Sequence, residues 1–443
     1  MRGWALGLGL LAGCVHAEAP QQTPPLAEAE RVMLASASTP IVGSDSDYDA
    51  LLAEAGQARF VLLGENSHGT ADYYRERARI TLRLVRERGF RAVAIEGDWP
   101  EVERANRYVR WMSEDASADQ ALSGFTRFPR WMWRNAEFAE LIDALREHNR
   151  QRPPAERVGV YGMDVYNLFE AADAVVAYLE QSEPGGAALA RTHYRCFEPY
   201  EDEPQAYGAA ARRPERSCED EAARVLQELQ AEPRPADPEA AEIQFSAVRN
   251  AAHVAAAEAY YRALYAGSYS WNVRDTAMLE TVEAVAAHVG ALAGGDGKVV
   301  VWAHNTHVGD ARATDAAWRG ELNLGQLLKE RHDGRTLSVG FLTRGGTVMA
   351  APEWGENGRV YAVQPARPDS YAALFREAGL DRALVLTRQA GETLNRAERL
   401  QRAIGVIYLP DQERTAHYFD ARIAEQFDAV IYLDQTEAVT PLP

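Results

Sequence analysis

Cysteine is scarce in this chain of 443 residues, which contains three. No two of them have the Cys-x-x-Cys spacing of a zinc or redox site. Cys14 lies in an apolar N-terminal segment, whereas Cys196 and Cys218 flank a polar stretch rich in Glu, Pro, Arg and Ala. Two cysteines in this arrangement predict a disulfide that closes a surface loop in an oxidising compartment.

Positive charge is also in deficit. Lys and Arg number 47 against 65 Asp and Glu, so the formal net charge is −18. A phosphate backbone or an anionic lipid surface is repelled over most of such a molecule, and we expect no nucleic-acid partner. Hydrophobic residues make up 47% and charged residues 25% of the chain, which excludes a mostly disordered or fibrous protein.

Several catalytic motifs are missing. The chain has no Gly-x-Ser-x-Gly, no His-Glu-x-x-His, no glycine-rich phosphate loop and no dinucleotide fingerprint. These absences disfavour serine hydrolases of the common kind, zinc proteases, kinases and dehydrogenases.

Residues 1–17 have the features of an export signal. Met1 and Arg2 precede an apolar run that is too short to cross a bilayer as a permanent helix. The tetrapeptide Leu11-Ala12-Gly13-Cys14 resembles a bacterial lipobox with Cys14 as the lipidated residue, and cleavage after Ala17 is the alternative. Both alternatives predict an exported protein, either periplasmic or anchored to the membrane as a lipoprotein. Residues 18–49 are predicted to form a tether and N-terminal segment.

Short apolar runs alternate with helical patterns through most of the remaining chain. Four runs begin at Phe60, Ala92, Val158 and Val299, and each is followed at once by polar residues. Further runs extend the predicted sheet at 337–341, 383–386, 405–409 and 429–433. Helical patterns lie between the early strands, at 74–87, 101–112, 136–149 and 168–179. Strands that are apolar throughout are typical of parallel sheets with both faces covered, so the expected fold is α/β with a mainly parallel central sheet flanked by helices.

Residues 184–295 interrupt this alternation. They begin with Gly, Pro and the two cysteines and continue as long Ala- and Glu-rich helical patterns. We interpret this region as an inserted helical subdomain over the cleft. It separates a first part of the α/β core, residues 50–183, from a second part, residues 296–443.

Polar residues follow the first four apolar runs, where each predicted strand ends. The carboxyl ends of parallel strands meet at one edge of a sheet, and ligands of open α/β sheets bind there. We therefore expect the following side chains to lie close together: Glu65, His68, Glu96, Asp98, Asp164, His304 and His307.

Some of these residues have simpler explanations. Asp98 precedes Trp99-Pro100, and we interpret it as the N-cap of a helix. His68 lies between Ser67 and Gly69 in a turn too polar for a core position, which favours a functional role. His304 and His307 are three residues apart and share one face of a starting helix, but hydrogen bonding within the loop explains either one equally well.

Histidine and carboxylate side chains can activate water in two ways. A neutral imidazole takes a proton from water, a nearby Glu holds its tautomer, and an Arg or second His stabilises the oxyanion. Alternatively, the same side chains hold a divalent metal that activates the water. The residue types alone leave both possibilities open.

Seven ordered motifs resemble the erythromycin esterase family and extend from about Ala50 to the C-terminus. They are Gly64-Glu-Asn-Ser-His-Gly69, Glu96-Gly-Asp-Trp99, Arg127-Phe-Pro-Arg-Trp-Met-Trp-Arg-Asn135, Tyr161-Gly-Met-Asp164, Trp271-Asn-Val-Arg-Asp-Thr-Ala-Met278, Trp302-Ala-His-Asn-Thr-His307 and Asn323-Leu-Gly-Gln326. The resemblance implies an α/β core, a helical subdomain over a deep cleft, and hydrolysis of an ester or macrolide lactone without a metal or other cofactor.

The resemblance also implies roles for individual residues. His68 is expected to be the general base and Glu65 its carboxylate partner, with Glu96, Arg77 and the pair His304 and His307 in the same site. Three further residues are assigned to binding of a small-molecule ester or lactone: Asp164, Trp131 and Asn305. The alternative is a protein that binds a metal or a haem-type ligand, or a metal-dependent hydrolase, with the same cluster of His and Glu.

Overall fold

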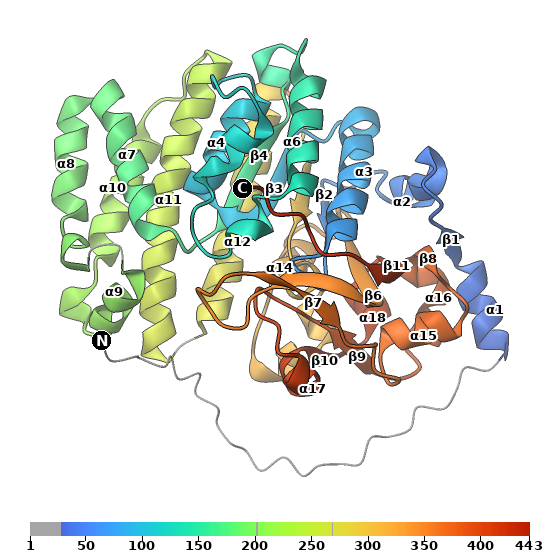
Figure 1. Ribbon diagram of the computed structural model, residues 1–443. Coiled ribbons are helices and arrows are strands. Elements are labelled where there is room, and N and C mark those ends of the chain that lie inside the picture. Colours follow the sequence, from blue (N-terminus) through green and yellow to red (C-terminus); the bar gives the residue numbers. More distant parts are fainter. Residues whose placement is uncertain (1–27, 201–202, 268) are drawn as a thin grey trace.

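One central sheet organises the fold (Figure 1). The computed structural model describes residues 28–200, 203–267 and 269–443, so the predicted export signal and Cys14 lie outside the described residues. The sheet has the strand order β1-β8-β11-β6-β2-β5-β3-β4, with β7 paired to β6. Its strands are β1 (Ser38–Pro40), β2 (Phe60–Leu63), β3 (Ala92–Asp98), β4 (Gly159–Asp164), β5 (Val299–Trp302), β6 (Thr336–Ala350), β7 (Arg359–Val363), β8 (Arg382–Leu386) and β11 (Ala429–Thr436). From β11 to β4 all neighbours are parallel, whereas β8, β1 and β7 pair antiparallel.

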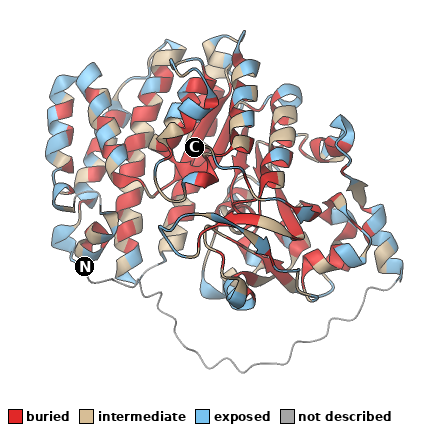
Figure 2. Cartoon of the chain, in the orientation of Figure 1, coloured by how far each residue is buried: buried red, intermediate tan, exposed pale blue. Residues whose placement is uncertain are grey.

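Helices cover both faces of the sheet because its strands are apolar on both sides. In β2, Val61 and Leu63 pack into one core cluster and Phe60 and Leu62 into the other. The central strands β2, β3, β4 and β5 are buried throughout, and the outer sides of the helices carry exposed residues (Figure 2). The first cluster contains residues of α2 (Asp49–Glu54), α3 (Ala71–Arg88), α4 (Trp99–Val109), α5 (Ala118–Ala121) and α6 (Ala136–Asn149). The second contains residues of α1 (Glu28–Ser36), α12 (Ser270–Ala293), α13 (Asn305–Val308), α14 (Leu324–Arg331), α15 (Tyr371–Glu377), α16 (Thr387–Leu394) and α18 (Ile423–Gln426).

The predicted α/β class with a central sheet flanked by helices is confirmed. The prediction of a strand at 405–409 is wrong. The segment makes an isolated bridge instead, between Ile407 and Ala351. Just before it, the N–H of Ile404 donates to the carbonyl of Asn66 and the N–H of His68 donates to the carbonyl of Ile404. β9 (Arg399–Arg402) and β10 (Tyr418–Ala421) form a separate antiparallel pair. The short helix α17 (Glu413–Ala416) lies between them in the chain.

A third hydrophobic cluster belongs to a group of helices beside the β3 and β4 side of the sheet (Figure 1). These helices are α7 (Leu168–Ser182), α8 (Pro184–Tyr194), α9 (Pro204–Ala211), α10 (Glu219–Ala231) and α11 (Pro238–Ala266). This helical unit thus begins at α7, ahead of the predicted boundary at residue 184, while α12 packs on the sheet. No helix in the described part of the chain is long and apolar enough to cross a membrane.

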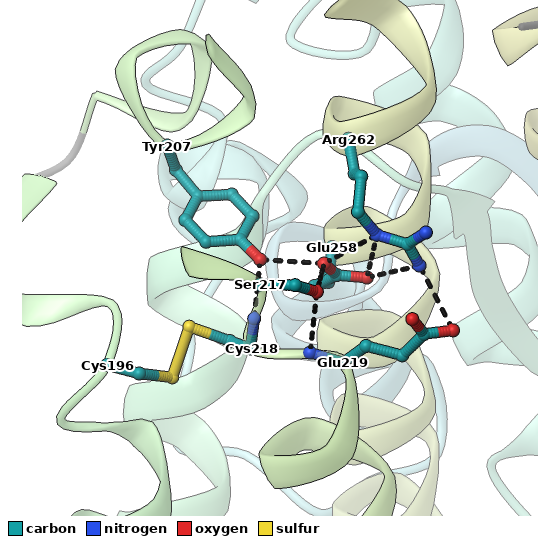
Figure 3. The surroundings of a disulfide bond; sticks show 7 residues. All are labelled: Cys196, Tyr207, Ser217, Cys218, Glu219, Glu258 and Arg262. Carbon is teal, nitrogen blue, oxygen red and sulfur yellow. Dashed lines mark hydrogen bonds and ion pairs between the residues drawn. A yellow bond between two sulfur atoms is a disulfide. The ribbon is translucent and has the colours of Figure 1, made fainter. Parts of the chain in front are cut away.

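The predicted disulfide between Cys196 and Cys218 is present in the helical unit (Figure 3). The N–H of Cys218 donates to the Tyr207 hydroxyl at 2.9 Å, and this hydroxyl donates to Glu258 at 2.7 Å. Glu258 also pairs with Arg262, one turn further along α11. The disulfide therefore ties the segment before α9 to a hydrogen-bonded network on α11.

Candidate active site

The loop after β2 positions His68. It has glycine at both ends, Gly64 and Gly69, and a Cβ atom on Gly69 would collide with the carbonyl oxygen of Met349 in β6. The carbonyl of Gly69 instead accepts hydrogen bonds from the N–H groups of Met349 and Val439, both at 3.0 Å. Because the loop is bonded to neighbouring segments in this way, the His68 ring is held in a defined place at the carboxyl end of the sheet.

His68, Glu65 and Arg77 form a chain of contacts. Nδ1 of His68 lies 2.9 Å from Oε1 of Glu65, and the other carboxylate oxygen lies 2.7 Å from Nη2 of Arg77. Glu65 and Arg77 are fully buried, and the guanidinium of Arg77 lies over the ring of Trp302. The carboxylate accepts from Nδ1–H, so the neutral imidazole carries its proton there and leaves Nε2 as a proton acceptor.

Glu96, at the end of β3, lies on the other side of the His68 ring. Its Oε1 is 3.9 Å from Nε2 of His68 and 2.9 Å from Nη2 of Arg274. Its Oε2 accepts a hydrogen bond from the backbone N–H of His304. Burial raises the pKa of Glu96, but the neighbouring side chains of His307, His68 and Arg274 lower it more, to well below the usual value.

Arg274 of α12 connects three of the strand-end residues. Its guanidinium holds Asp164 through two hydrogen bonds of 2.7 Å, reaches Glu96, and lies 3.0 Å from Nε2 of His307. Arg274 was not among the site residues predicted from the sequence. Because the residue lies on a helix and not after a strand, only its place in the motif that begins at Trp271 could have indicated its importance.

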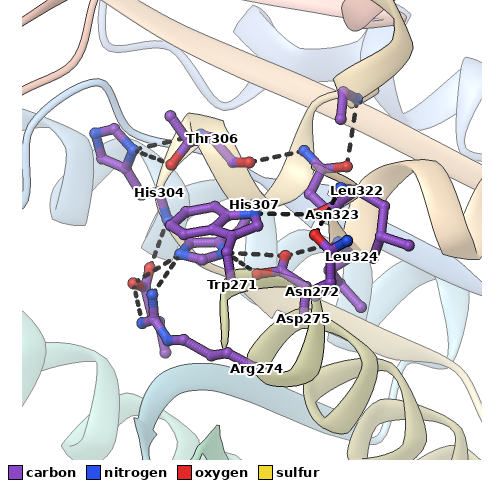
Figure 4. A network of polar contacts seen from close by, with 12 residues as sticks. Trp271, Asn272, Arg274, Asp275, His304, Thr306, His307, Leu322, Asn323 and Leu324 are labelled. Carbon is purple, nitrogen blue, oxygen red and sulfur yellow. Dashed lines mark hydrogen bonds and ion pairs between the residues drawn. The ribbon is translucent and has the colours of Figure 1, made fainter. Parts of the chain in front are cut away.

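His307 is enclosed by α12 (Figure 4). Nδ1 lies 3.0 Å from both oxygens of Asp275, Nε2 lies 3.3 Å from Oε1 of Glu96, and the ring stacks on Trp271. Burial lowers the pKa of His307, but the carboxylates of Asp275 and Glu96 raise it further, to about 9. Arg274 opposes this rise, because its Nη1 lies 3.0 Å from Nε2 of His307, so Nδ1, which faces Asp275, is the nitrogen that holds its proton most firmly.

His304 has the opposite character. Burial and the neighbouring His68 lower its pKa to about 3, so the ring is neutral. Its Nδ1 faces the N–H and the hydroxyl of Thr306, which places the proton on Nε2. Nε2 has no hydrogen-bond partner, and the ring centroid lies 5.0 Å from that of His68.

Two cavities meet at this cluster. A cavity of about 240 Å³ and another of about 720 Å³ share four residues in their walls, namely His68, Glu96, Arg274 and Gly405. Asp98 and Asp164 line the smaller cavity, and His304 and His307 line the larger one. Gly405 lies in the segment 405–409, which was predicted to be a strand. This segment instead forms part of the wall of both cavities.

Three predicted site residues face away from these cavities. Arg77 is in the buried chain behind His68. The Asn305 amide is bonded to the N–H and the carbonyl of Phe341, which ties α13 to β6. Trp131 lines a neighbouring hollow with Gly358, while the two residues that follow it, Met132 and Trp133, line the smaller cavity.

Asp98 does not act as a helix cap, although it occupies the N-cap position of α4. One of its oxygens lies 2.6 Å from Nη1 of Arg127, and the other accepts from the backbone N–H of Tyr166. The prediction of a capping role is therefore wrong. The carboxylate is instead used to join the 125–135 segment to the end of β4.

The arrangement offers no ready-made metal site in the described residues. Within 28–200, 203–267 and 269–443, no three His, Cys, Asp or Glu side chains are grouped as metal ligands. Both oxygens of Glu65 and both oxygens of Glu96 are already bonded to protein groups. What the cluster does provide is an imidazole with a free nitrogen between two carboxylates.

The sequence profile of the erythromycin esterase family matches residues 85–436. The chain belongs to the erythromycin esterase family. The match covers most of the chain and includes Glu96, Arg274 and both His304 and His307, while His68 precedes it. Family membership identifies the protein as a hydrolase of this family.

Three solved structures share the fold. A succinoglycan biosynthesis protein is 21% identical, with a TM-score of 0.76 over 94% of this chain and 98% of its own. A protein from Bacillus cereus is 19% identical, with a TM-score of 0.77 over 95% of this chain and 100% of its own. The erythromycin esterase EreC, in its open conformation, is 16% identical, with a TM-score of 0.62 over 89% of this chain and 94% of its own.

Proposed function

We propose that the protein hydrolyses an ester or lactone, with a macrolide as one candidate substrate, and that His68 is the general base. The observation that carries this proposal is the position of His68, whose Nδ1 is held by Glu65 while its ring lines both cavities. Nε2 takes a proton from a water molecule as that water attacks the ester carbonyl. Glu65 and Glu96 then stabilise the imidazolium that forms. The acyl C–O bond breaks as the tetrahedral intermediate collapses, and the imidazolium returns its proton to the leaving alkoxide, which leaves as an alcohol.

His304 is proposed as the donor to the oxyanion. Its neutral ring carries a proton on Nε2, which makes no hydrogen bond of normal geometry, faces the backbone of Asn66 and lies beside His68. Negative charge that develops on the carbonyl oxygen accepts a hydrogen bond from this N–H. His307 is held on both nitrogens by carboxylates, so we assign it a positioning role toward Glu96.

The sizes of the cavities suit a substrate with one large and one small part. The larger cavity, about 720 Å³, is within the usual range for drug-sized ligands, while the smaller one, about 240 Å³, lies below it. An ester bond placed at His68 directs the larger part of the substrate past His304 and the smaller part toward Asp98.

The test is incubation of the purified protein with a panel of macrolides and simple lactones, followed by mass spectrometry for the addition of one water. We expect at least one product in the wild type and none above background in His68→Asn. A panel that contains erythromycin also tests the macrolide as a substrate. Equal product formation by His68→Asn would show that the base is a different residue.

A chelator separates this proposal from the metal-dependent alternative. We expect prolonged dialysis against EDTA to leave turnover unchanged, because Glu65 and Glu96 are compensated by Arg77 and Arg274. Loss of turnover that zinc or manganese restores would establish a metal-dependent hydrolase. Binding of a haem-type ligand without any product from the panel would favour the binding-protein alternative.

We further propose that the protein is exported and lipidated at Cys14. The lipobox sequence supports this proposal, as does the disulfide, because disulfides persist in oxidising compartments. The intact mass of protein extracted from membranes should match a mature chain that begins with a lipidated Cys14. A mature chain that begins at Glu18 without lipid would refute lipidation and leave export standing.

A further inference from the structure

The smaller cavity contains a carboxylate, Glu101, that has no ion pair among the described residues. Four carboxylates line it, and three of them are ion-paired: Glu96 and Asp164 with Arg274, and Asp98 with Arg127. Glu101, on the first turns of α4, has no ion pair within 4.0 Å among the described residues, although it is only 9% exposed. Its bonded partner is the backbone N–H of Arg127.

Aromatic rings make up much of the wall around this carboxylate. Phe125, Phe128, Tyr166 and Trp354 all line the same cavity. Phe128 and Trp354 contact each other with ring centroids 5.0 Å apart, and Trp354 is half-exposed at the outer side. A carboxylate surrounded by aromatic faces is the arrangement that binds alkylated ammonium groups, because both the charge and the ring quadrupoles attract a cation.

We propose that this cavity is a subsite for an ammonium group on the substrate, with Glu101 as its counter-ion. The inference rests on the proposed function, since it assumes that the ester bond lies at His68 on the shared wall of the two cavities. It narrows the substrate class to esters or lactones that carry an amine on the smaller part. The volume of about 240 Å³ accommodates a substituent and not a whole drug-sized molecule.

An anion is the competing occupant, because arginines also line the cavity. Arg274 is bonded to Asp164 and Glu96, and Arg127 is bonded to Asp98, so their charges are already compensated. Arg130 is exposed, and water and salt screen its charge. Glu101 is therefore the buried acidic group of this wall that has no ion pair of its own, and a cation bound beside it favours its ionised form.

Protonation gives an independent check. Burial and the neighbouring charges of Asp98 and Glu170 raise the pKa of Glu101 to about 8, against the opposing effect of Arg127. A bound cation favours the ionised form, so binding near neutral pH releases a proton. Affinity for a cation of fixed charge should rise about tenfold from pH 7 to pH 9, while affinity for a neutral probe should stay constant.

The experiment is calorimetric titration with three probes of the same shape: choline, neutral 3,3-dimethylbutan-1-ol and anionic 3,3-dimethylbutanoate. At pH 8 we expect choline to bind at least about tenfold more tightly than the alcohol, and the carboxylate more weakly than either. Equal affinity for choline and the alcohol, or tighter binding of the carboxylate, would overturn the proposal. No turnover is needed, so failure here is distinguishable from failure of the proposed hydrolysis.

Two variants and a control locate the binding. Glu101→Gln should remove the preference for choline and its pH dependence, whereas Glu140→Gln, the same change at an exposed position on α6, should preserve both. Trp354→Ala, at a half-exposed ring, should weaken choline about threefold while the protein stays folded. If Glu101→Gln still prefers choline over the neutral alcohol, the subsite is refuted. If Glu101→Gln does not fold, unweakened binding of choline to Trp354→Ala refutes it.

Discussion

Two buried networks in this protein use the same chemical groups in different ways. Glu258, next to the disulfide, accepts hydrogen bonds from Tyr207 and Ser217 and pairs with Arg262 (Figure 3). Glu96, at the end of β3, pairs with Arg274 and the backbone of His304. The Glu258 network joins α11 to α9 and to the loop before α10, whereas the Glu96 network opens on two cavities. A buried carboxylate paired with arginine is thus a structural link in one place and part of a candidate active site in the other.

The largest expected difference between the networks is in catalysis. On a confirmed substrate, His68→Asn should lower kcat by roughly 10²- to 10⁴-fold, because general-base catalysis contributes about that much. The melting temperature should stay close to that of the wild type. His193→Asn, on α8 of the helical unit, is the matched control and should keep full activity. If His68→Asn keeps most of its activity, the general base is a residue other than His68.

Removing Arg274 should cost much more stability than removing Arg262. Arg274→Met leaves Asp164 and Glu96 buried without their cation and should lower the free energy of unfolding by about 3–5 kcal/mol. Arg262→Met should cost about 1 kcal/mol or less, since its side chain is 30% exposed and Glu258 keeps two hydroxyl donors. Urea unfolding of both variants measures the difference, and equal losses would contradict this account of the two networks.

The raised pKa of His307 should make stability depend on pH. Its pKa is about 9 in the folded protein, above the value of about 6.5 for an unfolded chain, so the charged form stabilises the fold. The contribution is complete below about pH 6.5 and is lost as the pH rises through 9, and it amounts to roughly 3 kcal/mol. The difference in unfolding free energy between wild type and His307→Gln should shrink over this window. A difference that is constant from pH 6 to 9.5 would show that His307 does not change its charge on folding.

The disulfide should affect stability and leave activity unchanged. Replacing both Cys196 and Cys218 with Ser opens a loop of 22 residues and should lower the unfolding free energy by up to about 3 kcal/mol. Activity should be unchanged, because neither cysteine lines the two cavities that contain His68. A large loss of activity in a folded double variant would show that the helical unit and the site are coupled.

Much of the site could be predicted from strand ends. Glu65 and His68 follow β2 and Glu96 ends β3, and the parallel pairing of these strands with β5 brings them together. Arg274 and Asp275 could not be found in this way, because they lie on a helix whose other residues are mostly apolar and small. Their role depends on how α12 packs against the ends of the strands.

The same distinction explains the corrections. The apolar run at 405–409 has the composition of a strand, but its pairing is limited to isolated bridges: Ile404 is bonded to the loop of His68, and Ile407 is paired with Ala351 just after β6. Asp98 has the position of a helix cap, but its two carboxylate oxygens accept hydrogen bonds from Arg127 and from the backbone N–H of Tyr166 instead. In both cases, hydrogen bonds to residues distant in the chain determine the structure, and the local sequence pattern does not.

The amino-acid sequence by itself determined the α/β class, the strand-end positions of the functional residues and the pairing of Cys196 with Cys218. These follow from apolar periodicity and from residue type, which are local properties of the chain. Only the tertiary structure decided that the pKa of His304 is lowered and that of His307 raised, although the two lie three residues apart. The physical reason is that the pKa of a buried ring depends on its neighbours: Asp275 and Glu96 outweigh burial and Arg274 at His307, while at His304 burial and His68 outweigh Glu96.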